Sequence, residues 1–155
     1  MTNAYDKLYL EKARVSLGRM LDFAVNQLDY DADDFFRRFI ASGIATRFEH
    51  GDSSTIAGKS GIETAYAVIE YTLTQNSELN EALQIEIDHR VDRSPLYWAG
   101  WALAYYQWST CLKFQQIIDR ISVSEIVKMY HPYHEMDIRQ FCDHMDTLYR
   151  DRKTG

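Results

Sequence analysis

Apolar positions recur every three or four residues over most of the chain, which is the spacing of one face of an α-helix. The longest run covers residues 5–28, where positions such as Leu17 and Leu21 lie on one helical face. This run predicts a long amphipathic helix. Gly18, in its middle, has no side chain to hold a neighbour away and indicates a close helix crossing.

Two further helices are expected in the first half of the chain. Asp31 is a suitable N-cap for one, and paired apolar positions extend its pattern to Phe48. A helix with so many apolar positions must be packed against other parts of the protein on most of its sides. Ser60 and Glu63 form a capping-box sequence, in which each side chain can bond the other's backbone amide, and it predicts a helix that ends near Thr74.

The segment of residues 75–93 has the least regular pattern. It is polar at first, and apolar positions then alternate with a period of two over residues 83–91, which is typical of a short extended segment. A lone strand leaves backbone groups unpaired. Pairing with the same segment of a second copy would satisfy them, so a homodimer is a possible assembly.

An aromatic block at residues 94–108 contains all three tryptophans and three of the eleven tyrosines. Ser94 as N-cap and Pro95 as first helical residue open a helix there. Aromatic side chains then recur along one face of this central helix, at Tyr97, Trp101 and Tyr105 among others. We expect this block to be mainly core, with some aromatic surface left to meet a partner.

The C-terminal part reads as three more helices. A short one is expected over residues 114–121, and a second follows the capping box of Ser122 and Glu125, with Pro132 as its stop. The last is expected over residues 134–150. The sequence therefore predicts an all-α fold, a single-domain compact helical bundle of about six helices over residues 1–155.

The composition supports the all-α class, and the net charge limits the kinds of partner to expect. Of 155 residues 46% are hydrophobic, with only two prolines and seven glycines, and no window reaches the length of apolar sequence that spans a bilayer. Without a targeting pattern at the N-terminus, we expect a cytoplasmic protein. The formal net charge of −6 disfavours direct nucleic-acid binding and leaves a basic protein partner open.

Three motifs suggest chemistry and have simpler interpretations. Residues 51–60 end like a phosphate-binding loop, but six residues instead of four separate the first glycine from Gly-Lys-Ser, and helix capping by Ser60 explains the sequence. His131, His134 and Glu135 are candidate metal ligands that capping and solvated surface explain as well. Cys111 and Cys142 are expected to be reduced and packed. We expect no metal and no cofactor.

Two alternative functions remain open on sequence grounds. Arg139 and His144 have the Arg-x4-His spacing of the small all-helical ribonucleases called HEPN domains, although such a match arises easily by chance. Residues 114–127 have the weaker outline of a helix-turn-helix regulator. Its second helix, the one that would read the DNA, offers only Lys128 as a cation for phosphate contact.

Two blocks resemble an uncharacterised family of small bacterial proteins. They are residues 39–63, from Phe39-Ile40-Ala41-Ser42-Gly43 through Gly58-Lys59-Ser60-Gly61, and the Tyr97-Trp98-Ala99-Gly100-Trp101 helix, and the similarity extends to residues 134–138. Relatives lie in mobile or toxin–antitoxin-like gene clusters, some beside toxins resembling ADP-ribosyltransferases. The resemblance implies an accessory or neutralising protein and carries over no catalytic motif.

The leading hypothesis is therefore a non-enzymatic interaction protein, an antitoxin-like or anti-defence inhibitor that binds a basic protein. Aromatic anchors would supply affinity, and acidic residues would speed encounter. The candidate partner-binding residues are Tyr97, Trp101, Tyr105, Asp29, Asp31, Asp33 and Asp34.

Overall fold

A computed structural model describes residues 3–73 and 94–152, and within these residues the chain is helical, without strands. The extended segment expected at residues 83–91, with the pairing between copies built on it, lies outside the described residues. The α-helices are α1 (Leu10–Asp22), α2 (Ala32–Ala41), α3 (Ile44–Glu49), α4 (Ser53–Ile56), α5 (Gly61–Leu73), α7 (Pro95–Thr110), α8 (Phe114–Ile118), α9 (Val123–Lys128), α10 (Tyr130–Tyr133) and α11 (Ile138–Asp151).

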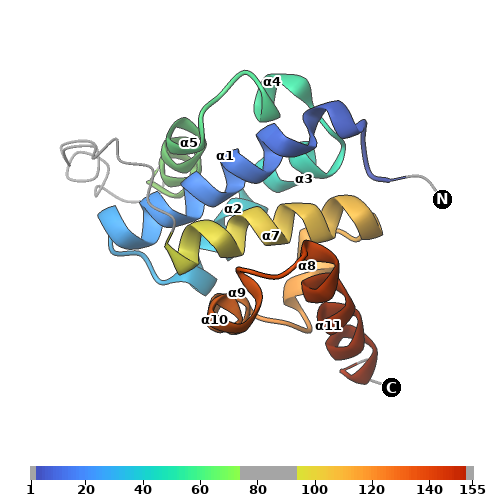
Figure 1. Cartoon of the computed structure of the whole chain (residues 1–155). Helices are drawn as coiled ribbons and strands as arrows, with labels where there is room; N and C mark the ends of the chain where they lie inside the picture. Colours follow the sequence, from blue (N-terminus) through green and yellow to red (C-terminus); the bar gives the residue numbers. More distant parts are fainter. Residues whose placement is uncertain (1–2, 74–93, 153–155) are drawn as a thin grey trace.

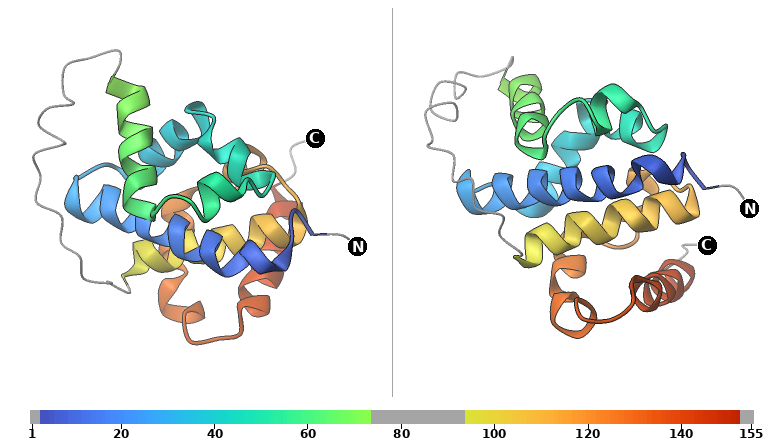
Figure 2. Two further views of the ribbon diagram at one scale, coloured as in Figure 1. Left: turned by 90° about the horizontal axis from the view of Figure 1, so that it is seen from above. Right: turned by 45° about the horizontal axis from the view of Figure 1, so that its top comes forward.

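Helices α1 and α7 lie side by side and antiparallel through the middle of the molecule (Figure 1). Helices α3 to α5 lie on one side of this pair and α9 to α11 on the other (Figure 1, and the right view of Figure 2), whereas α2 lies behind the pair and contacts α8 and α9. Near the N-terminus the indole N–H of Trp108 donates to the carbonyl oxygen of Tyr5 at 2.8 Å, and the amide of Ala4 donates to that of Trp108 at 3.0 Å. These two bonds fasten the N-terminal residues to the C-terminal end of α7.

Two glycines allow the close approach of α1 and α7. A Cβ atom on Gly100 would lie 2.5 Å from the carbonyl oxygen of Leu17, and one on Gly18 would lie 2.7 Å from that of Tyr97. Neither distance is tolerated by real side chains, so backbone meets backbone here. The close crossing expected at Gly18 is confirmed.

The first two predicted helices are each divided. The expected helix of residues 5–28 consists of a 3₁₀ turn (Lys7–Tyr9), α1 and a π-helical segment (Phe23–Gln27). The second ends at Ala41, because Gly43 adopts a left-handed conformation with φ of 86° before α3 begins. The apolar pattern continues across this break since α2 and α3 bury their faces in the same core, and the prediction of one helix was wrong.

Two local predictions in the second half were also wrong. Pro132 lies inside the short helix α10 and does not stop the preceding helix, which ends at Lys128. A proline in a first turn removes only an amide that has no intrahelical acceptor there, so it fits. Cys111 is exposed at the end of α7 with φ of 62°, whereas Cys142 is partly buried as expected. The described part contains ten α-helices, more than the six expected.

The core is rich in aromatic rings, and α7 contributes to it from more than one side. Trp98, Tyr106 and Trp108 are buried, whereas Tyr97, Trp101 and Tyr105 are only partly covered. Rings from α2, α3 and α8 pack edge-to-face beyond them, an arrangement that aromatic quadrupoles favour. The aromatic block is thus core on one side and partly accessible on the other.

The crossing of α1 and α7 can be tested by Gly100→Ala. Alanine favours an isolated helix by about 1 kcal/mol over glycine, yet the added methyl group would meet the backbone of Leu17 and Gly18. We expect a net loss of about 1–3 kcal/mol in the free energy of unfolding, measured by urea denaturation.

Gly43→Ala is the matched control, because a Cβ there meets nothing within 4 Å and only the left-handed backbone is strained. That strain costs about 1 kcal/mol. A Gly100→Ala variant as stable as the parent would contradict the close contact.

Candidate functional site

A cavity of about 380 Å³ between α1, α7 and α10 combines aromatic and charged side chains. We call it the aromatic cavity. It is lined by Glu11, Tyr97, Trp98, Trp101, Tyr130 and His134. Four of these six side chains present aromatic rings without a formal charge, and Glu11 is the one that carries a negative charge at neutral pH.

Local sequence signals fix the α7 side of this cavity. The Ser94 hydroxyl accepts a hydrogen bond from the amide of Tyr97 at 3.1 Å and itself bonds the carboxylate of Asp22. With Pro95 at the first helical position, the start of α7 is set in sequence and tied to α1. Trp98 and Trp101 follow at helical spacing and lie along one cavity wall.

Tyr130 and His134 form the opposite side. The two rings stack with centroids 4.1 Å apart and planes at 10°, and Nδ1 of His134 lies 2.7 Å from the carbonyl oxygen of Tyr130. Tyr130 also meets the edge of Trp98, with centroids 6.1 Å apart. This contact links α10 to α7 and gives the cavity a rigid aromatic wall.

Arg14, which sequence reasoning did not select, lies on the aromatic face of α7. Its guanidinium carbon is 3.4 Å from the ring centroid of Trp101 and 4.9 Å from that of Tyr105. Nε donates to the carbonyl oxygen of Trp101 at 3.3 Å, and Nη1 is 3.8 Å from a carboxylate oxygen of Glu11. The aromatic side chains of α7 therefore already hold one cation of the chain itself.

Arg14 is buried from solvent to an extent that is unusual for a charged side chain. Arg14 is 8% exposed, and within the described residues its Nη2 atom has no hydrogen-bond partner. Burial lowers the pKa of this guanidinium, and the negative charge of Glu11 opposes that shift. Stacking on two rings offsets part of the cost of desolvation.

The three predicted aromatic contact residues come together, and the four acids do not join them. Tyr97 and Trp101 line the cavity, and Tyr105 is connected to them through Arg14. None of the four aspartates lines it. Asp29 is exposed with φ of 61°, Asp31 caps α2 by accepting from the amide of Asp34, and Asp34 pairs with Arg38 at 2.9 Å.

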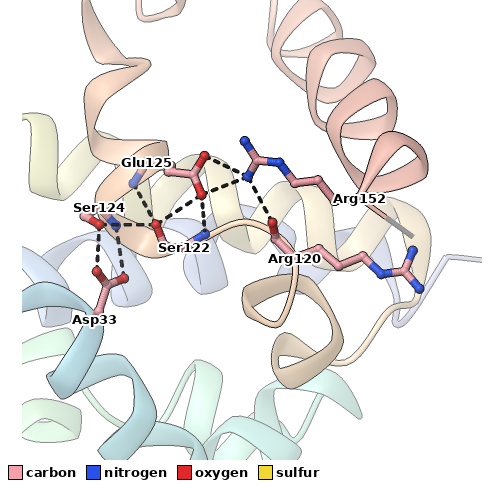
Figure 3. A network of polar contacts seen from close by, with 6 residues as sticks. All are labelled: Asp33, Arg120, Ser122, Ser124, Glu125 and Arg152. Atoms are coloured by element: carbon pink, nitrogen blue, oxygen red, sulfur yellow. Dashed lines mark hydrogen bonds and ion pairs between the residues drawn. The ribbon is translucent and has the colours of Figure 1, made fainter. Parts of the chain in front are cut away.

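Asp33 belongs to a polar network that joins three elements (Figure 3). Its carboxylate accepts from the amide and hydroxyl of Ser124 at 3.1 and 2.7 Å. Beside it, Ser122 and Glu125 complete the predicted capping box, and Arg152 donates to Glu125 at 2.8 Å and to the carbonyl oxygen of Arg120 at 3.0 Å. This network fastens the start of α9 to α2 and to the end of α11.

The two residues of the ribonuclease hypothesis have separate partners. Arg139 forms two hydrogen bonds with the carboxylate of Asp137, at 3.0 and 3.2 Å, and its side chain is 79% exposed. His144 instead stacks on Tyr133 with centroids 5.3 Å apart. Side chains five residues apart on a helix diverge, so α11 alone does not join them into one site. The short helices α8 and α9 match the outline of the helix-turn-helix hypothesis.

Neither a metal site nor a membrane-spanning helix is found among the described residues. No three histidine, cysteine or acidic side chains in residues 3–73 and 94–152 are grouped so that they could hold a metal ion. None of the helices in these ranges combines the length and apolar character needed to cross a bilayer.

The comparisons with known proteins give no family for this chain: no protein-family model matches it, and neither a curated protein nor a solved structure does. The site therefore has to be interpreted from its own chemistry.

The network at Glu125 predicts a pH dependence of stability. Burial raises the pKa of Glu125, but the hydrogen bond from Arg152 and those from Ser122 outweigh it, so the pKa lies below its ordinary value. A lowered pKa in the folded state contributes stability above the unfolded pKa, and this is lost as the pH falls through the folded pKa. Glu125→Gln should therefore lower stability at pH 7 more than at acid pH, as measured by thermal unfolding.

Glu70→Gln, on the exposed face of α5, is the control for removal of one carboxylate. Its melting temperature should follow the parent at every pH. A Glu125→Gln variant that loses as much stability below the carboxylate pKa range as at pH 7 would argue against an ionised Glu125–Arg152 pair.

Proposed function

We propose that this protein is a non-enzymatic interaction module that binds a basic protein, and that the aromatic cavity accepts a lysine or arginine side chain of that partner. The observation that carries this proposal is one cavity whose described lining combines aromatic rings with one carboxylate, that of Glu11. The resemblance of the aromatic helix to proteins of toxin–antitoxin-like clusters supports an antitoxin-like or anti-defence inhibitor.

Cation binding follows from the charge distribution of the lining. The faces of tryptophan and tyrosine rings attract cations with about 0.5–1 kcal/mol at exposed sites and about 2 kcal/mol when desolvated. Glu11 adds a carboxylate whose side chain is 70% exposed, so an incoming cation can reach it. A neutral or anionic group would gain neither interaction.

Arg14 is an internal example of the same recognition. Its guanidinium stacks on Trp101 at 3.4 Å, which demonstrates that the α7 rings accommodate a planar cation at contact distance. Trp101 also lines the cavity. A partner arginine would extend this arrangement, since its planar guanidinium can stack on rings and bond a carboxylate at once.

Overall charge favours the same class of partner. The net charge of −6 attracts a basic surface at long range and speeds encounter without adding specific contacts. Asp31, Asp33 and Asp34 serve as hydrogen-bond acceptors within the fold and are among the acidic residues that produce this net charge. Affinity would come mainly from the buried aromatic contacts.

A single-side-chain probe tests the cavity directly. N-acetyl-arginine amide should change the tryptophan fluorescence saturably at millimolar concentration, whereas its uncharged isostere N-acetyl-citrulline amide should not. Glu11→Gln should weaken the arginine probe by about threefold, in line with an exposed ion pair. Trp101→Ala should weaken it further.

Glu70→Gln should bind the probe as the parent does. The same variants can be immobilised and used to capture binding proteins. Proteins that the Glu70→Gln variant retains and the Trp101→Ala variant loses should be basic. Equal binding of the arginine and citrulline probes, or capture of acidic proteins only, would refute the proposal.

A further inference from the structure

A second cavity has the opposite charge preference. It has a volume of about 280 Å³ and lies between α1 and the start of α5. Lys12 and Arg19 of α1 line it together with Lys59, which is remote from them in sequence. Ser16, Ser60 and Gly61 also contribute, and among the described residues that line it Glu11 is the only acidic one. We call it the basic cavity. A local excess of cations is notable in a chain whose net charge is −6.

These cations form no ion pair with the carboxylates of the described residues. In the described ranges, Lys12, Arg19 and Lys59 take part in no ion pair, although other surface arginines such as Arg38 and Arg139 do. Three cations around one cavity, with no ion-pair partner among the described residues, repel one another. An anion placed among them would relieve that repulsion.

Backbone amides at the start of α5 add further donors. The capping box uses the amides of Ser60 and Glu63, each at 3.1 Å from its acceptor. The next two N–H groups, those of Gly61 and Ile62, have no acceptor in the part of the chain that the structure describes. The N-terminus of a 13-residue helix also carries the positive end of its dipole.

Gly61 brings this helix end against α1. A Cβ atom there would lie 2.4 Å from the carbonyl oxygen of Ser16 and 2.6 Å from Cβ of Arg19, so only glycine permits the approach. The contact places the start of α5 against the part of α1 that contains Ser16 and Arg19. Two elements far apart in sequence therefore form one set of donors.

An independent observation comes from Ser16. It lines the basic cavity, is 4% exposed, and its hydroxyl has no hydrogen-bond partner among the described residues. Buried hydroxyls are nearly always paired, because an unpaired one retains the cost of desolvation. A ligand oxygen in the cavity would give this hydroxyl its partner.

We infer that the basic cavity binds the phosphoryl group of a small phosphorylated molecule. Phosphoryl oxygens accept several hydrogen bonds and carry the charge that three cations and a helix N-terminus attract. The stretch Gly58-Lys59-Ser60 does not form a nucleotide-binding loop, since no strand precedes it in the described residues. Here the cations of α1 take the place of the missing glycine-rich cradle.

The experiment titrates the full-length protein with inorganic phosphate and with glycerol 3-phosphate, against chloride at equal ionic strength. The melting temperature should rise saturably with both phosphates, and the amide NMR signal of Gly61 should shift. Arg19→Gln and Lys59→Gln should each weaken binding by about tenfold. Tighter binding of the ester than of the free ion would identify a phosphorylated metabolite as the ligand class, and the reverse would identify the free ion.

Two further variants separate binding from folding. Ser16→Ala should weaken phosphate binding and, without phosphate, raise the melting temperature, because it removes an unpaired buried hydroxyl. Lys128→Gln, an exposed lysine of α9 outside the cavity, should bind as the parent does. The inference would be overturned if chloride raised the melting temperature as much as phosphate does. It would also be overturned if Lys128→Gln weakened phosphate binding as much as Arg19→Gln does. Glu11 is left unchanged throughout, since it also lines the aromatic cavity, and a negative result here leaves the proposed function unaffected.

Discussion

The backbone contact between α1 and α7 is the constraint on which the remaining structure depends. At Gly18 and Gly100 the two helices approach to a distance that no larger residue permits. The antiparallel crossing sets the register of every other contact between them, so that Arg14 meets Trp101 and the start of the chain meets Trp108. Both sides of the molecule are then built on this pair (Figure 1).

The same crossing explains how a charge is retained in the interior. Arg14 would be costly to bury alone, since a desolvated guanidinium loses its hydration and one of its nitrogens has no partner within the described residues. The rings of Trp101 and Tyr105 and the nearby carboxylate of Glu11 offset part of that cost. Arg14 in turn covers the aromatic face of α7, which leaves only a limited part of these rings to line the aromatic cavity.

Local signals in the sequence predicted much of the fold because they act over a few residues. The Ser60–Glu63 and Ser122–Glu125 capping boxes and the Ser94-Pro95 opening all appear as expected. The break at Gly43 was missed, since the apolar pattern of α2 continues into α3 and hides a turn that only the backbone conformation reveals. The all-α class followed from periodicity, and the number of helices did not.

The sites were harder to predict because they join residues that no sequence spacing connects. Tyr97 and Trp101 could be selected from the aromatic block, but their neighbours Glu11 and Tyr130 come from helices whose packing is set by tertiary contacts. One signal was available: Arg14 lies four residues after Leu10 and three before Leu17, on the apolar face of its helix. A charge there has to find a partner in the core.

The two cavities follow from one property of α1. Successive side chains on a helix are about 100° apart, so Glu11 and Lys12 diverge although they are adjacent in sequence. Glu11 borders both cavities, whereas Lys12 lines the basic cavity alone, together with Arg19 two turns later. Helix α1 thereby separates an aromatic surface suited to cations from a basic surface suited to anions. The close contacts of Gly18 with Tyr97 and of Gly61 with Ser16 fix the positions of α7 and α5 around this helix, and with them the positions of the two cavities.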